Sequence, residues 1–349
     1  MLDKYYLGAN TPQGFRSEYG GLQDDPRIRK LWILKGGSGC GKSTLMKTLA
    51  RRAEAAGYRT EWIPCSSDPD SLDGLVIPAL GAALVDGTAP HVLEPRLCGC
   101  GANYVNLGAC YREAALEEIA LELRKTKAAN AACYVPAYAA LRAAGALLDG
   151  LRSIAPSLTE NDRRAILRRL RDVCPAAGIG TGTVRRVFLS AITPKGLLTA
   201  AAQGFRSLVI EDPFCKGGPL LAQLADRLRR DRFDLVLAMD PMDPEVPAGV
   251  VVEGEGVAFF RSTPLFPVTD FSETATDLGP LLPSPENGTA AESARAALLQ
   301  LRALVGQAVT HLRQAKEYHD RLEELCRPAV DFSRVDRITA RLSKVILGA

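Results

Sequence analysis

The chain has 349 residues, of which 47% are apolar and 24% charged, and its formal net charge at pH 7 is +3. This length suffices for two domains, and the composition is that of a folded globular protein rather than a disordered one. So small a charge gives no reason to expect a nucleic-acid partner. The N-terminus does not resemble a secretory signal, and no uninterrupted apolar run approaches the roughly 18 residues of a membrane span, so we expect a cytoplasmic protein without a membrane partner.

The first predicted element is a short strand that enters a turn at residues 5–14, and its sequence recurs later. Residues 187–196 repeat the pattern aromatic-Leu-small-Ala-x-Thr-Pro-x-Gly. Such a repeat indicates two related halves in one chain. We divide them as 1–178 and 184–349, because Pro175 and the glycine-rich residues 178–182 are typical of a linker.

Residues 31–49 predict a buried strand, a glycine-rich turn and the start of a helix, and the turn matches the pattern G-x-x-x-x-G-K-[ST]. In such a loop the glycines turn backbone N–H groups toward phosphates, Lys42 reaches the β- and γ-phosphates, and the Ser43 hydroxyl binds Mg²⁺. The sequence therefore predicts binding of ATP or GTP with Mg²⁺ in the first half. The residues expected to hold the nucleotide are Gly36, Gly37, Ser38, Gly39, Cys40, Gly41, Lys42, Ser43 and Thr44.

Cysteines at two places in the sequence bear on ligand binding: Cys40, and the pair Cys98 and Cys100. Cys40 lies inside the loop at the N-terminus of a helix, where we expect the thiol pKa to be lowered and alkylation to block nucleotide binding. Cys98 and Cys100 form a close pair but lack the second pair that a zinc ribbon needs, so a structural zinc is not favoured there.

Three further side chains are candidates for chemistry at the phosphates. Asp86 ends the apolar strand 82–85, where a Mg²⁺-organising Walker B carboxylate is expected, but Gly87 rather than Glu follows it, so fast hydrolysis is not expected. Asp68, after the predicted strand 60–64, could position water or a substrate hydroxyl, and His91 could lie near the γ-phosphate. The alternative role for Asp68 is turn capping in an Asp-Pro-rich loop.

The second half departs from the first where the phosphates would bind. Its strand 208–210 is followed by residues 211–219, which contain no phosphate-loop pattern. Glu211 and Asp212 would repel phosphates, and Pro213 and Pro219 each remove a backbone N–H. Arg261 stands where the first half has Asp86. We therefore predict a non-binding half with a structural or regulatory role.

Each half then continues into amphipathic helices. We expect helices from Glu113 to about Ala144, with a break near Pro136, and over the arginine-rich residues 163–171 in the first half, then over 290–325 and 334–347 in the second. The predicted fold is α/β: two tandem P-loop NTPase-like halves with parallel sheets, each extended by a helical hairpin and packed as a pseudo-twofold pair.

Four stretches resemble a family of bacterial proteins with two tandem P-loop NTPase halves, known as ATPases or ATP-binding proteins. They are Lys-Gly-Gly-Ser-Gly-Cys-Gly-Lys-Ser-Thr at 35–44, Cys-Ser-Ser-Asp-Pro-Asp-Ser-Leu-Asp-Gly at 65–74, Val-Asp-Gly-Thr-Ala-Pro-His at 85–91 and Ser-Ala-Ile-Thr-Pro-Lys-Gly at 190–196. Members of that family often carry a glycine-rich loop in the second half as well, which is eroded here. The resemblance implies nucleotide binding and supplies no substrate.

The leading functional prediction is Mg²⁺-dependent NTP binding with slow hydrolysis that acts as a conformational switch. One alternative is a small-molecule or nucleoside kinase, with an acceptor near Asp68 and Asp73 and an arginine lid from Arg112, Arg124 or the 163–171 cluster. The other is a non-catalytic nucleotide sensor that binds a protein partner through its helical hairpins.

Overall fold

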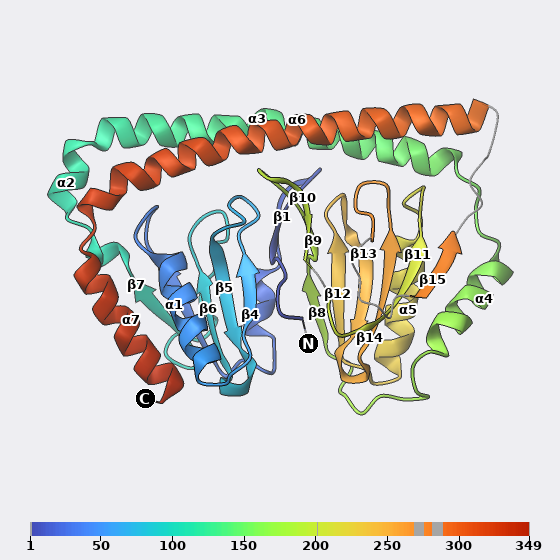
Figure 1. The fold of residues 1–349 in the computed structure, drawn as a ribbon, viewed down its shortest axis with the longest axis horizontal. Coiled ribbons are helices and arrows are strands. Elements are labelled where there is room, and N and C mark those ends of the chain that lie inside the picture. The colour runs from blue at the N-terminus through green and yellow to red at the C-terminus, as the bar shows by residue number, and fades with distance from the viewer. Residues whose placement is uncertain (1, 201, 269–275, 281–288, 349) are drawn as a thin grey trace.

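A computed structural model of the chain describes residues 2–200, 202–268, 276–280 and 289–348. In this part of the chain two large β-sheets stand side by side, with helices on their outer faces and two long helices across one end of both (Figure 1). Both sheets combine parallel and antiparallel strands, so the protein is mixed α/β. A shared apolar core, with Ile33 and Val85 on one side and Val236 and Phe260 on the other, fills the space between the sheets.

The first sheet follows the order β4-β5-β6-β3-β7. Its strands are β3 (Lys30–Lys35), β4 (Glu61–Pro64), β5 (Leu72–Ile77), β6 (Ala82–Asp86) and β7 (Ala102–Asn106). β3 pairs in parallel with β6 and β7, whereas β5 is antiparallel to both its neighbours. The prediction of parallel sheets is therefore wrong in both halves, because β5 here and β13 (Asp243–Val252) in the second sheet are antiparallel to both their neighbours. The connections 65–71 and 78–81 are shorter than the dozen or so residues that a parallel crossover needs.

The second sheet follows the order β15-β11-β14-β13-β12-β8. Its strands are β8 (Val184–Val187), β11 (Arg206–Glu211), β12 (Leu235–Asp240), β13 (Asp243–Val252), β14 (Val257–Ser262) and β15 (Thr276–Pro280). Apart from β8, this order matches that of the first sheet when it is read backwards. The first sheet's β4, β5, β6, β3 and β7 then correspond to β12, β13, β14, β11 and β15. Leu34 lies opposite Asp86 in the first sheet and Ile210 opposite Arg261 in the second, so Asp86 and Arg261 occupy corresponding positions.

Two small hairpins lie where the halves meet, in the part of the chain that the structure describes. They are β1 (Gly8–Thr11) with β2 (Gly14–Ser17), and β9 (Ser190–Thr193) with β10 (Gly196–Thr199). The Asn10 side-chain amide donates to the Ile192 carbonyl at 2.9 Å, and the Tyr138 hydroxyl donates to Asn10 Oδ1 at 2.9 Å. The repeated segments recognised in the sequence therefore contact each other and the long helix above them.

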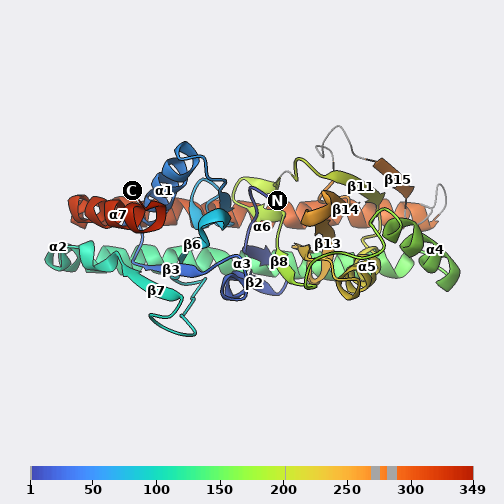
Figure 2. The same ribbon diagram turned by 90° about the horizontal axis from the view of Figure 1, so that it is seen from below.

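The helices are α1 (Lys42–Ala55), α2 (Glu113–Glu118), α3 (Ala120–Ile154), α4 (Glu160–Arg171), α5 (Gly218–Arg230), α6 (Thr289–Cys326) and α7 (Phe332–Leu347). α3 and α6 run antiparallel side by side (Figure 2). Arg321 of α6 pairs with Glu122 of α3 at 2.9 Å near one end, and Asn130 of α3 donates to the Ala315 carbonyl of α6 at 2.7 Å further along. The two helices together form what we call the roof.

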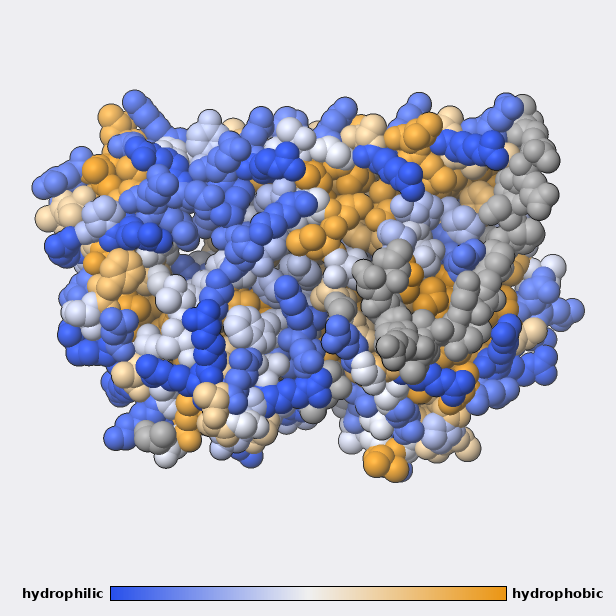
Figure 3. All heavy atoms as spheres, in the orientation of Figure 1, coloured by the Kyte–Doolittle hydropathy of each residue, from blue (hydrophilic) through white to orange (hydrophobic). Residues whose placement is uncertain are grey.

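α3 continues through Pro136, so the predicted break there is wrong; the interruption lies at Ile119 instead. Proline removes one helical hydrogen bond, but Ala137, Leu141 and the buried residues beyond them pack against α6 and the second half, which holds the helix together. Hydrophobic side chains accordingly gather beneath the roof over the second half, whereas the face over the first half is largely hydrophilic (Figure 3).

The chain crosses between the halves twice. α3 leads from the first sheet to the far side of the second, where α4 packs on α5; α6 returns, and α7 packs on α1 (Figure 1). The long helices of the two halves therefore pair with each other instead of forming one hairpin on each half. The division into 1–178 and 184–349 describes the order of the chain, but each segment contributes a helix to the other's packing.

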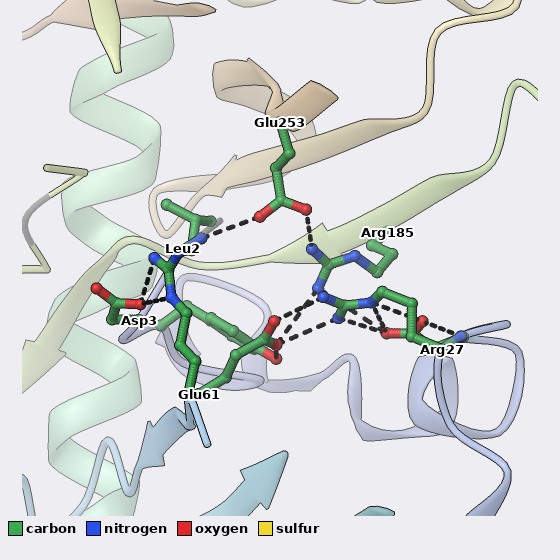
Figure 4. A network of polar contacts seen from close by, with 9 residues as sticks. Leu2, Asp3, Arg27, Glu61, Arg185 and Glu253 are labelled. Atoms are coloured by element: carbon green, nitrogen blue, oxygen red, sulfur yellow. Dashed lines mark hydrogen bonds and ion pairs between the residues drawn. The ribbon is translucent and has the colours of Figure 1, made fainter. Parts of the chain in front are cut away.

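A buried ionic network joins the two halves (Figure 4). Arg27 pairs with Asp25 at 2.7 Å and Glu61 at 2.6 Å, and Arg185 of β8 pairs with Glu253 at 2.6 Å. Arg185 also lies 3.8 Å from Glu61, so it links the carboxylates of both halves. These contacts fix the two sheets relative to each other.

Among the described residues, α3 is the one helix that is long and apolar enough to cross a membrane by length and composition. A helix in a protein core passes the same test, and α3 packs into the core from Ala137 to Leu151. The cytoplasmic location stays a prediction.

Candidate functional site

The glycine-rich loop, residues 36–44, connects β3 to α1 at the end of the sheet that lies under the roof. Gly39 and Gly41 have φ angles of +72° and +92°, which other residues rarely adopt. A Cβ on Gly39 would lie 3.0 Å from the Glu323 carbonyl of α6, so this close approach also requires glycine. Gly41 caps α1 without a side-chain hydrogen bond, which leaves the N–H groups of the first helical turn without a side-chain cap.

Lys42, the first residue of α1, lies beside Asp86, the last residue of β6. The Lys42 ammonium donates to the Gly36 and Gly37 carbonyls at 2.7 and 2.9 Å, and its nitrogen is 3.6 Å from Asp86 Oδ2. The other oxygen of Asp86 accepts from the Thr88 N–H and hydroxyl at 2.9 and 2.6 Å. The Ser43 hydroxyl oxygen accepts from the Leu72 N–H at 2.9 Å. Hydroxyl and carboxylate oxygens such as those of Ser43 and Asp86 are the ligands that Mg²⁺ prefers.

A cavity of about 1510 Å³ lies between the loop and the roof. Its floor includes Lys42, Ser43, Thr44 and Asp86, and its ceiling carries basic side chains from both long helices together with the acidic Asp320 and Glu323 of α6. The basic residues are Arg124 and Lys127 of α3, Lys316 and His319 of α6, and Arg327 just after α6. The volume exceeds the roughly 300–1,000 Å³ of a typical small-molecule site, so there is room for more than a nucleotide's phosphates.

The roof touches the loop directly. Apart from the close approach of Glu323 to Gly39, Lys316 lies 3.6 Å from Asp68 and hydrogen-bonds Asp320. The hydrogen bond from His319 lowers the pKa of Glu323. These contacts connect α6, whose other end packs on the second half, to the floor of the cavity.

Asp68 and His91 line the cavity, each already engaged with a neighbour. Asp68 faces Lys316, and Asp70 beside it pairs with Lys195 of the second half at 2.6 Å. The His91 ring is buried against Phe15 and Tyr19, with Nε2 3.3 Å from Asp73 Oδ2. His91 is thus oriented by a carboxylate and is not free in solvent.

Asp73 is the centre of a polar cluster that the sequence did not single out. It accepts from the Tyr19 hydroxyl at 2.8 Å and lies beside Cys65 as well as His91. Burial raises the pKa of Asp73, and burial, with the Asp73 charge, raises the pKa of Cys65 well above its ordinary value. Both residues belong to the stretch 65–74 that carried the family resemblance, but their convergence with Tyr19 and His91 depends on four separate segments.

Cys40 differs from its prediction. Its residue is 1% exposed, because it lies under the loop near Tyr111, and burial raises the pKa of the thiol although Lys42 partly opposes this. The predicted lowering of the pKa by the helix N-terminus is wrong, since desolvation of the thiolate outweighs it.

The predicted arginine lid is only partly present. Arg124 lines the cavity, but Arg112 donates to the Pro328 carbonyl and is not among its lining residues. The cluster 163–171 lies on α4 at the far side of the second half, where Arg171 pairs with Asp231 at 2.7 Å (Figure 1). The basic side chains that do line the cavity come from α3, from α6 and from Arg327 just after it, and no local sequence signal indicates the part played by α6.

The corresponding loop of the second half is filled by its own carboxylate. Asp212 accepts from the Lys216 and Gly217 N–H groups at 2.8 Å each and pairs with Arg261 at 3.1 Å. Lys216 turns its ammonium to the Ala155 and Pro156 carbonyls. A cavity of only about 30 Å³ borders Arg261. The Lys216 and Gly217 N–H groups are therefore taken by Asp212 and are not available to an external anion.

A scan against protein-family models finds no match, and searches of curated proteins and of solved structures find no significant similarity either.

Proposed function

We propose that the first half is a P-loop NTPase site that binds a nucleoside triphosphate, ATP in the first instance, with Mg²⁺ and hydrolyses it slowly. In this proposal the chain consists of two tandem P-loop-like halves, and the second is a degenerate copy that anchors the roof. The matching strand orders and the correspondence of Asp86 with Arg261 support the tandem arrangement.

The observation that carries the proposal is the arrangement of the glycine-rich loop, Lys42 and Asp86. The loop combines left-handed glycines with an uncapped helix N-terminus, and both features favour phosphate binding. Lys42 is held within 3.6 Å of Asp86, on the strand next to the loop. This placement gives one cation for the β- and γ-phosphates and one carboxylate for a metal ion.

In the proposed reaction Lys42 neutralises phosphate charge, and Ser43 and Asp86 would hold Mg²⁺. The metal, when bound, would offset the charge that develops between the β- and γ-phosphates. Gly87 follows Asp86 at the place where many ATPases have a glutamate, and Asp68 faces Lys316. Water is therefore activated weakly, which is the reason for a slow rate.

The contacts of α6 support a switch. Glu323 and Lys316 touch the floor of the cavity, while Leu301 and Val305 of the same helix lie in the core of the second half. Phosphate binding at the loop would change the first set of contacts, and a stiff helix would pass that change to the second half. The same burial weighs against a sensor that uses α3 and α6 to bind another protein.

The size of the cavity favours a small-molecule kinase as the second candidate. A nucleotide would leave part of the 1510 Å³ unfilled, and Arg124 and Lys127 on the ceiling suit an anionic phosphoryl acceptor. A kinase would show little phosphate release without its acceptor.

The test measures nucleotide affinity by calorimetry and phosphate release with ATP and with GTP, each with Mg²⁺. Lys42→Ala should weaken binding at least about ten-fold, equivalent to about 1.4 kcal/mol, and abolish turnover. Asp86→Asn should abolish turnover and weaken Mg²⁺ dependence. Lys216→Ala, the matched change in the second half, should alter neither quantity.

Each alternative result has a clear meaning. Tight binding without turnover in the wild type would exclude the hydrolase and favour the kinase. Wild-type affinity in Lys42→Ala would exclude the first loop as the nucleotide site.

A further inference from the structure

Three buried side chains with metal-binding atoms converge beside the large cavity. Cys65 follows β4, Asp73 lies in β5 and His91 lies after β6, and one ligand atom from each is within 4.8 Å of the others. The three residues are 9%, 4% and 5% exposed, respectively. Such close, desolvated packing of a thiol, a carboxyl and an imidazole needs a physical reason, because each group loses its hydration there.

The hydrogen bonding around this cluster is incomplete. Among the described residues, three buried side-chain atoms have no hydrogen-bond partner: Ser66 Oγ, Asp68 Oδ1 and His91 Nδ1. His91 Nδ1 belongs to the cluster itself and Ser66 directly follows Cys65, whereas Asp68, three residues after Cys65, has its Oδ1 3.6 Å from the Lys316 ammonium. Buried polar atoms are nearly always satisfied, so the unpaired His91 Nδ1 and Ser66 Oγ call for a further partner such as an ion, a ligand or water.

We propose that Cys65, Asp73 and His91 form a transition-metal site, with Zn²⁺ as the ion that fits them best. Thiolate, imidazole and carboxylate are its usual ligands, whereas Mg²⁺ and Ca²⁺ require oxygen ligands. The site is separate from the Ser43 and Asp86 oxygens assigned to Mg²⁺. It does not depend on the proposed NTPase function.

Three protein ligands leave one position of a tetrahedral ion open. Cys65 and His91 line the cavity, so water or a donor atom of a ligand could reach that position from there. The ion would also tie the loop after β4, which carries Asp68, to the loop after β6, which follows Asp86. It would thereby hold the acidic side of the cavity in place.

The second half offers an internal comparison. When residues 65–91 are aligned without gaps to 240–266, which matches Asp86 with Arg261, the residues Cys65, Asp73 and His91 correspond to Asp240, Ala248 and Phe266. Those three residues border the small cavity of about 30 Å³ in the second half. Alanine and phenylalanine cannot ligate a metal, so we expect one ion per chain and not two.

The experiment starts from the full-length protein stripped of metal with a chelator and then titrated with Zn²⁺ and Co²⁺. Metal content by plasma mass spectrometry should reach one equivalent, and Co²⁺ should give a thiolate-to-cobalt charge-transfer band. Cys65→Ser should abolish the band, and Asp73→Asn and His91→Gln should each weaken Zn²⁺ binding at least ten-fold. The double variant Cys98→Ser/Cys100→Ser should keep both the band and the stoichiometry.

X-ray absorption on the zinc-loaded wild type tests the ligands without any variant. One sulfur at about 2.3 Å and nitrogen or oxygen ligands at about 2.0–2.2 Å are expected. Absence of stoichiometric metal, a shell without sulfur, or loss of the band in the Cys98/Cys100 variant would each overturn the proposal. Lys42→Ala should retain the metal, so failure of nucleotide binding and failure of the metal site are told apart.

Discussion

The Cys40 thiol shows that a residue inside a recognised sequence motif can have a chemical environment that the motif does not predict. Its place at a helix N-terminus favours the thiolate, but it lies under the loop, and a Cβ added to Gly36 would be only 2.6 Å from its sulfur. Burial removes water from the charged form and dominates the pKa.

Cys40 should therefore react slowly with iodoacetamide near neutral pH. A raised pKa means a smaller thiolate fraction at any given pH, so its rate should lie well below those of the exposed Cys98 and Cys100 and should rise with pH. Peptide mapping by mass spectrometry after timed labelling measures this. Labelling of Cys40 as fast as Cys98 would show that the loop opens readily.

Asp212 gives a second prediction at the scale of a single residue. Its carboxylate is buried and holds Arg261, which also hydrogen-bonds Asp240. Removing one charge from a buried ionic group costs about 3 kcal/mol or more, so Asp212→Asn should lower the free energy of unfolding by that amount in chemical denaturation.

The matched control is Asp231→Asn. Asp231 also pairs with an arginine, Arg171, but its side chain is 39% exposed, so the loss should stay below about 1 kcal/mol. Equal losses of unfolding free energy in the two variants would contradict the view that Asp212 takes the place of a bound anion and stabilises the second half.

The roof shows what an element gains from its tertiary contacts. α3 contains Pro136 and many exposed residues before it, and it would not be expected to persist as one helix alone. Its later residues are buried against α6 and the second half, while its earlier residues span the cavity. One helix therefore has a part anchored in the core and a part that lines the cavity.

Two leucines on α3 test this division. Leu141 is fully buried and Leu121 is 66% exposed. Leu141→Ala should lower the free energy of unfolding by about 2–5 kcal/mol, whereas Leu121→Ala should change it by less than about 0.5 kcal/mol. Denaturant unfolding followed by circular dichroism compares them, and similar losses would argue that α3 is packed uniformly.

At the scale of the whole molecule, the ionic network couples the halves. Glu253 is part of the second half, and it accepts from the Leu2 N–H at 2.9 Å and pairs with Arg185 (Figure 4). Burial alone would raise the pKa of Glu253, but Arg185 and the Leu2 N–H outweigh it and hold that pKa below the ordinary 4.5.

This gives stability a defined pH dependence. Because the folded pKa of Glu253 is lower than its unfolded value, its contribution is fully present above pH 4.5 and is lost as the pH falls through the folded pKa. In Arg185→Gln the pKa of Glu253 should rise toward its unfolded value, so the contribution of Glu253 near neutral pH and its loss on acidification should both be smaller than in the wild type. Urea unfolding between neutral pH and about pH 3 measures this.

The control for the network is Arg59→Gln, which removes an exposed pair with Asp3. It should leave the pH profile unchanged, since exposed pairs are screened by solvent. An Arg185→Gln profile identical to the wild type would mean that the network does not determine acid stability.

The sequence by itself determined the local elements: the glycine-rich loop between a strand and a helix, Asp86 at the end of a neighbouring strand, and the repeat that relates the halves. These follow from short-range patterns, in which glycine conformation, apolar periodicity and turn residues act within a few positions. The loss of the phosphate-loop pattern in the second half could be recognised in the same way, because Asp212 and two prolines are unfavourable in a phosphate site.

Only the tertiary structure decided what surrounds that loop. The antiparallel β5, the pairing of α3 with α6, the exchange of α4 and α7 between halves and the convergence of Cys65, Asp73 and His91 all depend on contacts between segments distant in sequence. Such contacts are set by burial of apolar faces against whichever partner is in reach, and no local pattern encodes that choice. Burial also reversed the one pKa that the sequence predicted, because desolvation depends on the whole fold.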